Sequence, residues 1–353
     1  MIWQRLLAMK LYSNILSDRY IYQGTLNKQH PYNRIITQII ELLKNSNSRK
    51  LRNFCPLCNN SEAYKISEKD RYSLPITFLI CSKCGFIFSQ EYFSDDFLLF
   101  YYKSIYNNFK NKTETEDELF LSRTKPSSPS FQRYEFIKRV LGKKIEKIEV
   151  VMEPGCNDGC NLYPFLKNGK KVYGCDFDEN RISVGEKNDI NIFVGGIDKL
   201  LETNKKADLI ILSHVLAHVT DLNKFLASVK KLLKPNGFIF VETPGFRGWW
   251  DKMKIFKNYR KNFLDFIQFE FCYIFDLKLL EILFGKYNFK LYKGDEYIRS
   301  IFYSDANSNQ NVKSAFSDKG KEIGKSNLNY LLNIEKNFLR FLFLKRKFLK
   351  WKL

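Results

Sequence analysis

VMEPGCNDGC, residues 151–160, runs from a short apolar segment into a loop that is bracketed by Gly155 and Gly159. Such a junction is typical of nucleotide-binding folds, where the loop offers backbone N–H groups at the start of a helix. Asn157 takes the place of the middle glycine in a G-x-G-x-G loop, and no third glycine follows at the offset of the pyrophosphate fingerprint. The loop therefore predicts a nucleoside cofactor that has no pyrophosphate.

Strand-like and helix-like segments alternate around this loop, from about residue 131 to 245. The expected strands are 146–153, 171–178, 191–196, 207–213 and 237–244, and the expected helices begin within 162–166 and span 221–233. This alternation predicts a parallel, doubly wound α/β sheet that binds ligands at the carboxyl ends of its strands. Asp176 ends the second strand, about twenty residues after the loop, where an acid can accept both hydroxyls of a ribose. S-adenosylmethionine (SAM) is a cofactor that fits these features.

Two C-x-x-C pairs precede this region, Cys55-Pro-Leu-Cys58 and Cys81-Ser-Lys-Cys84, and Gly85 follows the second pair. Each pair lets two thiolates converge on one ion from a tight turn, and Gly85 suits a left-handed turn residue. Two such pairs complete a closed shell of four sulfurs, which predicts a structural Zn²⁺ site. A redox function is disfavoured because there are two pairs and no surrounding βαβ pattern.

The composition limits the class of protein. The 353 residues are 44% hydrophobic, which fits a packed protein of more than one domain. The formal charge of +20 is compatible with a nucleic-acid or anionic-membrane partner, but also with a compositional bias toward Lys, Asn, Ile, Phe and Tyr. No apolar run reaches the roughly 18–20 residues that cross a bilayer, and residues 1–20 resemble no secretory signal. We therefore expect a cytoplasmic protein whose eight cysteines are mostly reduced.

Composition shifts along the chain predict its domains. The expected parts are a basic helical extension (1–50), a zinc-binding module (51–106), a polar linker (107–130), a SAM-binding α/β domain (131–303) and a polar segment with a basic C-terminal helix (304–353). The last part ends in KRKFLKWKL, for which we weigh a peripheral contact with membrane against a solvated helix end.

The sequence resembles class I SAM-dependent methyltransferases, with a Rossmann-like sheet. The segments that carry the resemblance are Glu153-Pro-Gly-Cys-Asn-Asp-Gly159, Tyr173-Gly-Cys-Asp176 and the long stretch 207–244. The N-D-G loop, an L-A-H-V segment and the two cysteine pairs together resemble the zinc-containing nucleotide-sugar C-methyltransferases. That resemblance covers roughly residues 52–300 and implies methyl transfer to a keto-deoxysugar, with a structural zinc.

The resemblance also assigns residues to the cofactor. The implied SAM-binding residues are Glu153, Gly155, Cys156, Asn157 and Gly159 at the methionine end, Asp176 at the ribose, Phe177 and Ile197 at the adenine, and Ser213 near the methyl group. Gly196 occupies the position of the usual adenine-binding acid, so the adenine contact falls to the backbone of Ile197 or to Asp198.

Two departures from the sugar C-methyltransferases bear on the reaction. The large C-terminal domain of that family has no counterpart in the fifty or so residues after 300. In the segment FEFCYIF (269–275), Glu270 is present but Phe271 replaces the histidine that is the family's candidate base. Because C-methylation needs a base that forms an enolate, this replacement favours O- or N-methylation.

The candidate catalytic residues are His214, Glu270 and Tyr273. His214 follows the carboxyl end of an expected strand, whereas His218 is expected to make a structural hydrogen bond. A two-histidine metal face is the alternative for this pair, but no third ligand is evident. The aromatic stretch 248–266 is expected to lie over the acceptor site, either as a packed lid or as a stacking surface.

Three functions remain in competition. The favoured one is a methyltransferase that acts on a sugar or nucleotide-linked sugar in carbohydrate (glycan) biosynthesis. The alternative is a zinc-containing RNA methyltransferase, in which basic charge grips phosphates. The third is a binding protein of the same fold that has lost catalysis. The acceptor atom and the oligomeric state are left open.

Overall fold

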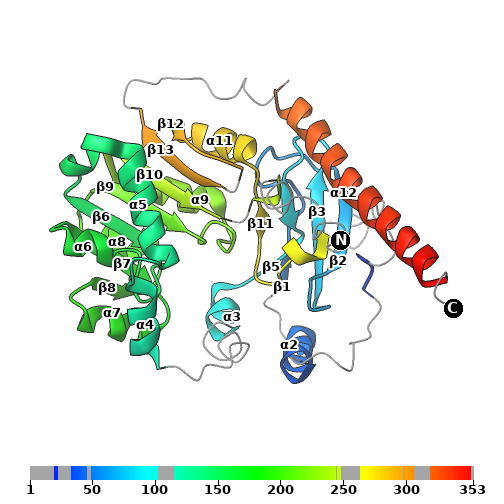
Figure 1. The fold of residues 1–353 in the computed structure, drawn as a ribbon, viewed down its shortest axis with the longest axis horizontal. Coiled ribbons are helices and arrows are strands. Elements are labelled where there is room, and N and C mark those ends of the chain that lie inside the picture. Colours follow the sequence, from blue (N-terminus) through cyan, green and yellow to red (C-terminus); the bar gives the residue numbers. More distant parts are fainter. Residues whose placement is uncertain are drawn as a thin grey trace, which may run out of the picture. The chain divides into compact units, whose positions relative to one another are not determined.

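The computed structural model describes residues 20–22, 33–45, 49–101, 115–243, 245–247, 263–296, 298–305 and 319–350 (Figure 1). The chain divides into two compact units that are interleaved in sequence. Unit 1 contains Met1–Phe97, Pro244–Ile282 and Asn311–Leu353, and unit 2 contains Leu98–Thr243 and Leu283–Gln310. This division differs from the expected domains, because residues 244–282 group with the cysteine-rich segment and not with the α/β sheet.

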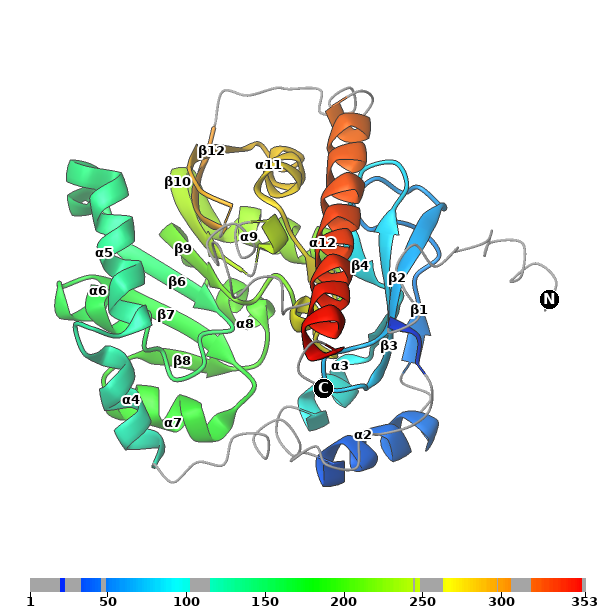
Figure 2. The same ribbon diagram turned by 45° about the vertical axis from the view of Figure 1, so that its right-hand side comes forward.

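Unit 2 is built on a seven-stranded sheet with the order β12-β13-β10-β9-β6-β7-β8 (Figure 2). Its strands are β6 (Val150–Pro154), β7 (Lys171–Asp176), β8 (Asn191–Val194), β9 (Ala207–Ser213), β10 (Leu233–Glu242), β12 (Phe289–Lys293) and β13 (Arg299–Ser304). The strands from β6 to β10 pair with one another in parallel, and the strand order reverses at β6 and β9. This confirms the doubly wound arrangement and places the ligand-binding crevice of such folds outside the ends of β6 and β9.

The sheet is mixed, which corrects the expectation of a wholly parallel one. β13 runs antiparallel to both β10 and β12. The connection from β12 to β13 is too short for a helical crossover, so β13 has to return as the second strand of a hairpin.

Two strand boundaries also differ from the predicted ones. β6 begins at Val150, because residues Gly142–Lys147 form a 3₁₀ helix, η4, with no buried side chain. β10 begins at Leu233, so the Lys-Pro-Asn-Gly segment expected to end the preceding helix lies inside the strand. There the register shifts between Leu233 and Phe238, and Asn236 takes a φ of 61°. The turn residues therefore mark a β-bulge.

Helices flank the sheet of unit 2. They are α4 (Glu116–Thr124), α5 (Pro129–Leu141), α6 (Tyr163–Lys167), α7 (Glu179–Lys187), α8 (Ile197–Glu202) and α9 (Leu222–Leu232), while α11 (Leu277–Gly285) crosses the boundary between the units. The segment 107–130, expected to be a linker, contains α4 and the start of α5. Thr115 forms a capping box with Glu118, and Ser128 caps a helix that has Pro129 in its first turn. The polar residues that suggested a linker are helix-start signals.

Unit 1 is built on antiparallel strands. A four-stranded sheet has the order β11-β4-β3-β2, and β1 pairs with β5. The strands are β1 (Arg49–Leu51), β2 (Ala63–Lys69), β3 (Pro75–Cys81), β4 (Ile87–Ser89), β5 (Glu91–Phe93) and β11 (Tyr273–Ile274). The helices are α2 (Asn33–Asn45), α3 (Asp95–Phe100), η6 (Phe263–Phe266) and α12 (Lys319–Lys350). β11 lies in the segment FEFCYIF and pairs with β4, which explains why that segment belongs to unit 1.

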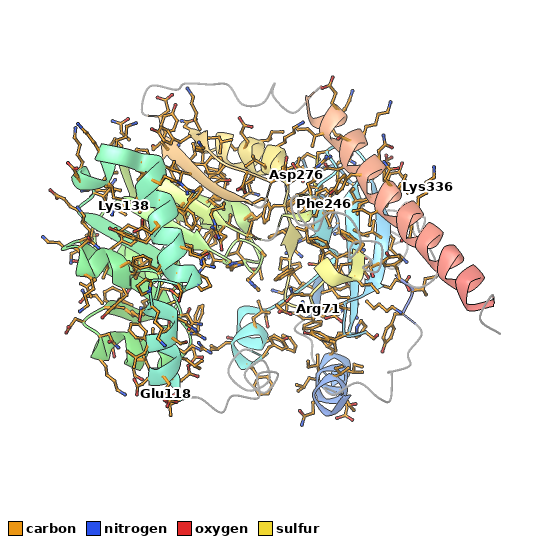
Figure 3. The ribbon with its side chains drawn as sticks, viewed as in Figure 1. Arg71, Glu118, Lys138, Phe246, Asp276 and Lys336 are labelled. Carbon is orange, nitrogen blue, oxygen red and sulfur yellow. The ribbon has the colours of Figure 1, made fainter. Side chains whose placement is uncertain are left out.

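The long helix α12 packs against the turn that follows Cys84. A Cβ added to Gly324 would lie 2.6 Å from the carbonyl oxygen of Lys83. The buried Asn327 donates hydrogen bonds to the carbonyl oxygen of Gly85 (3.3 Å) and to the carboxylate of Asp276 (2.5 Å). Figure 3 labels Asp276, next to Phe246. The contact therefore combines a close backbone approach with buried hydrogen bonds.

Two features predicted from the sequence lie largely outside the residues that the structure describes. Most of the aromatic stretch 248–266 lies outside the described residues, as do the side chains beyond Lys336 that include the basic C-terminal sequence. Of the helices that are described, none has the length and apolar character needed to cross a bilayer.

Candidate active site

The loop after β6 uses its backbone donors internally. Every N–H from Gly155 to Cys160 donates a hydrogen bond within the protein. The acceptors, in order, are Cys175 O for the first two, then Asp176 Oδ2, Asn157 Oδ1, Cys156 O and Asp158 Oδ1. The expectation that this loop offers free N–H groups to a ligand is therefore wrong, because the tight turn consumes them. The loop shapes the site and leaves recognition to side chains.

Asn157 is the centre of this turn. It has a φ of 58°, a left-handed conformation that Asn adopts more readily than most residues. Its side-chain Oδ1 accepts from its neighbour Asp158 N (3.0 Å) and from the buried Arg181 (Nη1, 2.7 Å). A glycine would permit the same backbone conformation but would lose both bonds. Asn157 thus replaces glycine because its side chain fixes the loop.

Asp176 lies at the end of β7 and is held by three backbone N–H groups. Asn157 N donates to Oδ2 (2.8 Å), and Phe177 N and Asp178 N donate to Oδ1 (2.8 and 3.1 Å). Burial raises the pKa of Asp176, and these three bonds oppose the rise. Oδ2 keeps room for a second donor, such as a ribose hydroxyl.

Glu153 at the end of β6 is a buried acid with an incomplete set of partners. Asn161 Nδ2 donates to Oε1 (2.7 Å), but Oε2 is buried without a hydrogen-bond partner. Burial raises the pKa of Glu153 to about 8, although Asn161 and the charge of Arg133 act in the opposite direction. A buried oxygen that lacks a donor fits the ammonium group of the methionine end of SAM.

The side of the site expected to take adenine is apolar. Phe177 is half exposed, and a Cβ added to Gly196 would lie 3.5 Å from its ring. Ile197 follows directly as the first residue of α8. The structure thus places the Phe177 ring next to Gly196, the residue that precedes Ile197.

The remaining loop residues have packing roles. Gly159 has a φ of 76°, and a Cβ there would lie 2.9 Å from Ile190. Gly155 also has a positive φ of 70° and lies beside Val215. Cys156 is buried against Gly174, and burial raises the pKa of its thiol, so it serves as a small core residue and not as a nucleophile.

A salt bridge that the sequence did not indicate joins α4 to the loop after β6. Arg123 Nη1 lies 2.6 Å from Oδ2 of Asp158, whose side chain is almost fully buried. Asp158 does not cap α6, because that helix begins at Tyr163. The acid instead closes the turn and joins it to α4.

His214 follows β9 and is held by Glu242, the last residue of the neighbouring β10. His214 has a φ of 58°, and its backbone N–H donates to the carbonyl of Glu242 (2.6 Å). Its ring Nε2 lies 3.3 Å from Oε1 of the same residue, while half of the side chain stays exposed. Ser213 lies directly across from Glu242 in the strand register.

Glu242 is the main site residue that the sequence analysis missed. Arg133 of α5 donates to Oε1 from both Nε and Nη2 (3.0 and 2.7 Å), and Arg299 of β13 donates to Oε2 (2.6 Å). Burial alone would raise the pKa of Glu242, but the bond to His214 and the two arginines lower it to about 2. One signal was available: Glu242 ends a buried strand, as Asp176 does.

The other two catalytic candidates belong to unit 1, whereas His214 belongs to unit 2. Tyr273 is 1% exposed; its hydroxyl accepts from Arg52 (3.2 Å) and its ring stacks on Phe86. Phe271 is buried, and Glu270 is partly exposed. A catalytic role for Glu270 or Tyr273 stays a prediction.

The four cysteines of unit 1 converge. Their sulfurs lie within 4.8 Å of one another, with Cys55–Cys84 at 3.7 Å and Cys58–Cys81 at 3.5 Å. A tetrahedral ion with Zn–S bonds of about 2.3 Å requires sulfurs about 3.8 Å apart. The residue after each pair, Asn59 or Gly85, has the positive φ expected of such a turn. The site therefore fits a four-sulfur zinc shell, and it is the one cluster of this kind among the described residues.

Comparison with known proteins finds a match that includes most of unit 2 and residues 244–282 of unit 1. Residues 130–293 match the family model described as "Methyltransferase domain". The ubiquinone biosynthesis O-methyltransferase of Bartonella bacilliformis is 28% identical over 99 residues, which cover 26% of this chain and 40% of that protein. Its counterpart in Pelagibacter ubique is 30% identical over 114 residues, which cover 31% of this chain and 47% of that protein. The chain thus matches less than half of the length of these relatives.

Solved structures resemble part of the chain at lower sequence identity. An amino pentose methyltransferase from Micromonospora echinaspora, solved with SAM bound, has 13% identity and a TM-score of 0.39. The match covers 55% of this chain and 98% of that one.

The role of Asn157 can be tested by pairing Asn157→Ala with Asn204→Ala. Asn204 is exposed and has nearly the same φ, 56°, so both variants bear the cost of a left-handed alanine. Asn157→Ala additionally loses the bonds to Asp158 and Arg181. We expect it to be less stable than Asn204→Ala by about 1–3 kcal/mol in denaturant unfolding. Equal losses of stability in the two variants would show that the Asn157 side chain does not fix the loop.

Proposed function

We propose, from the premise that residues 130–293 form a class I SAM-dependent methyltransferase domain, that the protein methylates a small molecule, a sugar or nucleotide-linked sugar. The proposal rests on the side chains that lie at the carboxyl ends of β6 and β7, within the residues that match the family model. Glu153 has an unpartnered oxygen for an ammonium group, Asp176 is oriented for a ribose, and Phe177 offers an apolar surface for adenine. The three side chains follow one another in the same order as the methionine, ribose and adenine parts of SAM.

We propose a hydroxyl oxygen as the atom that is methylated. Two curated relatives that match part of the chain are named O-methyltransferases. Phe271, where the resembling C-methyltransferases have a histidine, cannot take the proton that enolate formation must release. The sugar class of acceptor rests on the combined resemblance of the N-D-G loop, the L-A-H-V segment and the cysteine pairs.

In the proposed reaction, the protein aligns two reactants and accepts one proton. When bound, SAM supplies a methyl group on a positively charged sulfur. Glu153 and Asp176 hold the methionine and ribose ends, so that the methyl group has a fixed direction. The methyl group would pass from the sulfur of SAM to an oxygen of the acceptor, and His214 would take the hydroxyl proton.

Three further features belong to the proposal. Cys55, Cys58, Cys81 and Cys84 hold one structural Zn²⁺ with no open position for substrate. The protein works in the reducing cytoplasm, in keeping with cysteines that form no disulfide in the described structure. The C-terminal basic sequence makes at most a peripheral contact with membrane.

RNA methylation is the second candidate, and the excess of 58 Lys and Arg over 38 Asp and Glu is the observation that favours it. An RNA acceptor would be bound through phosphates, so its affinity would fall steeply with added salt.

The function can be tested by incubating the protein with methyl-labelled SAM and separate panels of sugars, nucleotide sugars, phenols and RNA. We expect label in an O-methylated sugar. Asp176→Asn should weaken SAM binding roughly 10- to 100-fold, because a charged hydrogen bond to the ribose is lost. Asp117→Asn, the same change at an exposed acid of α4, should bind SAM as the parent does.

The outcomes separate the competing functions. Salt-sensitive labelling of RNA would favour the second candidate. SAM binding without labelling of any panel would indicate a binding protein, and no SAM binding would contradict the proposal altogether.

The zinc site can be tested by elemental analysis of the purified chain. We expect one zinc ion per chain, lost in Cys81→Ser because three sulfurs leave the tetrahedral shell open. Cys272→Ser, a buried cysteine of unit 1 outside the cluster, should retain the metal. A full complement of zinc in Cys81→Ser, or none in the parent, would rule out this site.

A further inference from the structure

We propose that Glu242 is a positioning residue that fixes the His214 ring, so that Nδ1 is the atom that takes the proton of the acceptor. The inference rests on the proposed function and deepens it, because it names the basic atom and the group that orients it. Neither the family match nor the relatives assign a role to Glu242 or to the arginines that bind it.

The first step is that Glu242 holds His214 at two points. Its carbonyl accepts the backbone N–H of His214 at 2.6 Å, and its carboxylate Oε1 lies 3.3 Å from the ring Nε2. The backbone contact joins the end of β10 to a left-handed residue just beyond β9. Both the position and the direction of the imidazole are therefore set by one residue.

The second step is the identity of the proton on the ring. Glu242 is a carboxylate, since its pKa is lowered to about 2, and a carboxylate only accepts hydrogen bonds. The ring atom that faces it, Nε2, must then carry the hydrogen. In the neutral ring this leaves the lone pair on Nδ1. Half of the His214 side chain is exposed, which leaves the ring accessible to an acceptor.

The third step is that the carboxylate cannot turn away. Arg133 donates twice to Oε1 and Arg299 donates to Oε2, so both oxygens are bound from different elements. The charged groups that the described contacts place around His214 and Glu242 are these two arginines and, beyond Asn161, Glu153. With a cation on each of its oxygens, the Glu242 carboxylate is held in place to orient the His214 ring.

Arg133 also connects this cluster to the cofactor side. Its Nη1 donates to Asn161 Oδ1 (3.1 Å), and Asn161 Nδ2 donates to Glu153 Oε1 (2.7 Å). A continuous run of hydrogen bonds therefore extends from the acid expected to hold the methionine end of SAM to the proposed base. The acceptor class that follows is one whose reacting atom carries a removable proton, such as a hydroxyl.

The direct test is ¹⁵N NMR of the whole chain with labelled histidine, at a pH where the rings are neutral. The chain has only three histidines, so His30→Asn and His218→Asn assign the His214 signals by elimination. We expect the parent to carry its ring proton on Nε2 of His214. A parent spectrum with the proton on Nδ1 would overturn the proposal, and that result requires no variant at the cluster.

Glu242→Gln provides the second arm, because a neutral amide accepts the Nε2–H less strongly than a carboxylate and so weakens the preference for that tautomer. We expect the Nδ1–H form to appear and kcat to fall roughly 100-fold, with KM for SAM nearly unchanged. Glu202→Gln, at an exposed acid of α8, should leave spectrum and kinetics as in the parent. An unchanged kcat in a folded Glu242→Gln enzyme would overturn the inference. If the proposed function itself fails, the parent shows no methyl transfer while the Nε2–H signal remains.

Discussion

Three carboxylates at the carboxyl edge of one sheet impose the main physical constraint on unit 2. Glu153 lies one residue before the end of β6, and Asp176 and Glu242 end β7 and β10. Glu153 and Glu242 are buried, and Asp176 is partly buried. A buried anion is costly unless donors surround it, and like charges nearby increase that cost. The negative charges of Asp158 and Asp176 indeed contribute to the raised pKa of Glu153. The polar residues around the site can therefore be understood as donors that stabilise these carboxyl groups.

The three acids are compensated in three ways. Asp176 receives backbone N–H groups from a turn that Asn157 stabilises. Glu242 receives two arginines, and Asp158 receives a third from α4. Of the three acids at the sheet edge, Glu153 is the one that keeps a buried oxygen without a hydrogen-bond partner among the described residues. A cationic ligand would complete this set, which is why SAM, with both an ammonium and a sulfonium group, suits the edge better than a neutral or anionic nucleotide.

The sequence predicts the parts of this arrangement that depend on local patterns. The alternation of segments, the loop at Gly155, the acid at Asp176 and the four cysteines could all be recognised, because each has a fixed spacing. Residues 130–293 match a methyltransferase family model, while the sugar C-methyltransferase branch stays a prediction. What the sequence did not reveal depends on pairing across long distances. Arg133 and Arg299 lie more than 50 residues from Glu242, and β11 joins β4 across nearly two hundred residues. The internal use of the loop N–H groups could not be foreseen either, because it depends on the exact turn that Asn157 adopts.

We propose that Glu153 pairs with the ammonium group of SAM. Proton release on SAM binding is the measurement that tests this pairing. The pKa of Glu153 is about 8 in the structure, so the carboxyl is mostly protonated at pH 7. Pairing with an ammonium favours the charged form and lowers this pKa, so binding below pH 8 must expel a proton. Calorimetry in buffers of different ionisation enthalpy should show release of nearly one proton per SAM at pH 7, with affinity that rises toward pH 8. Glu153→Gln should release none. The parent protein could instead bind SAM without releasing a proton and with an affinity that does not change between pH 6 and 8. That result would show that Glu153 does not pair with the ammonium group.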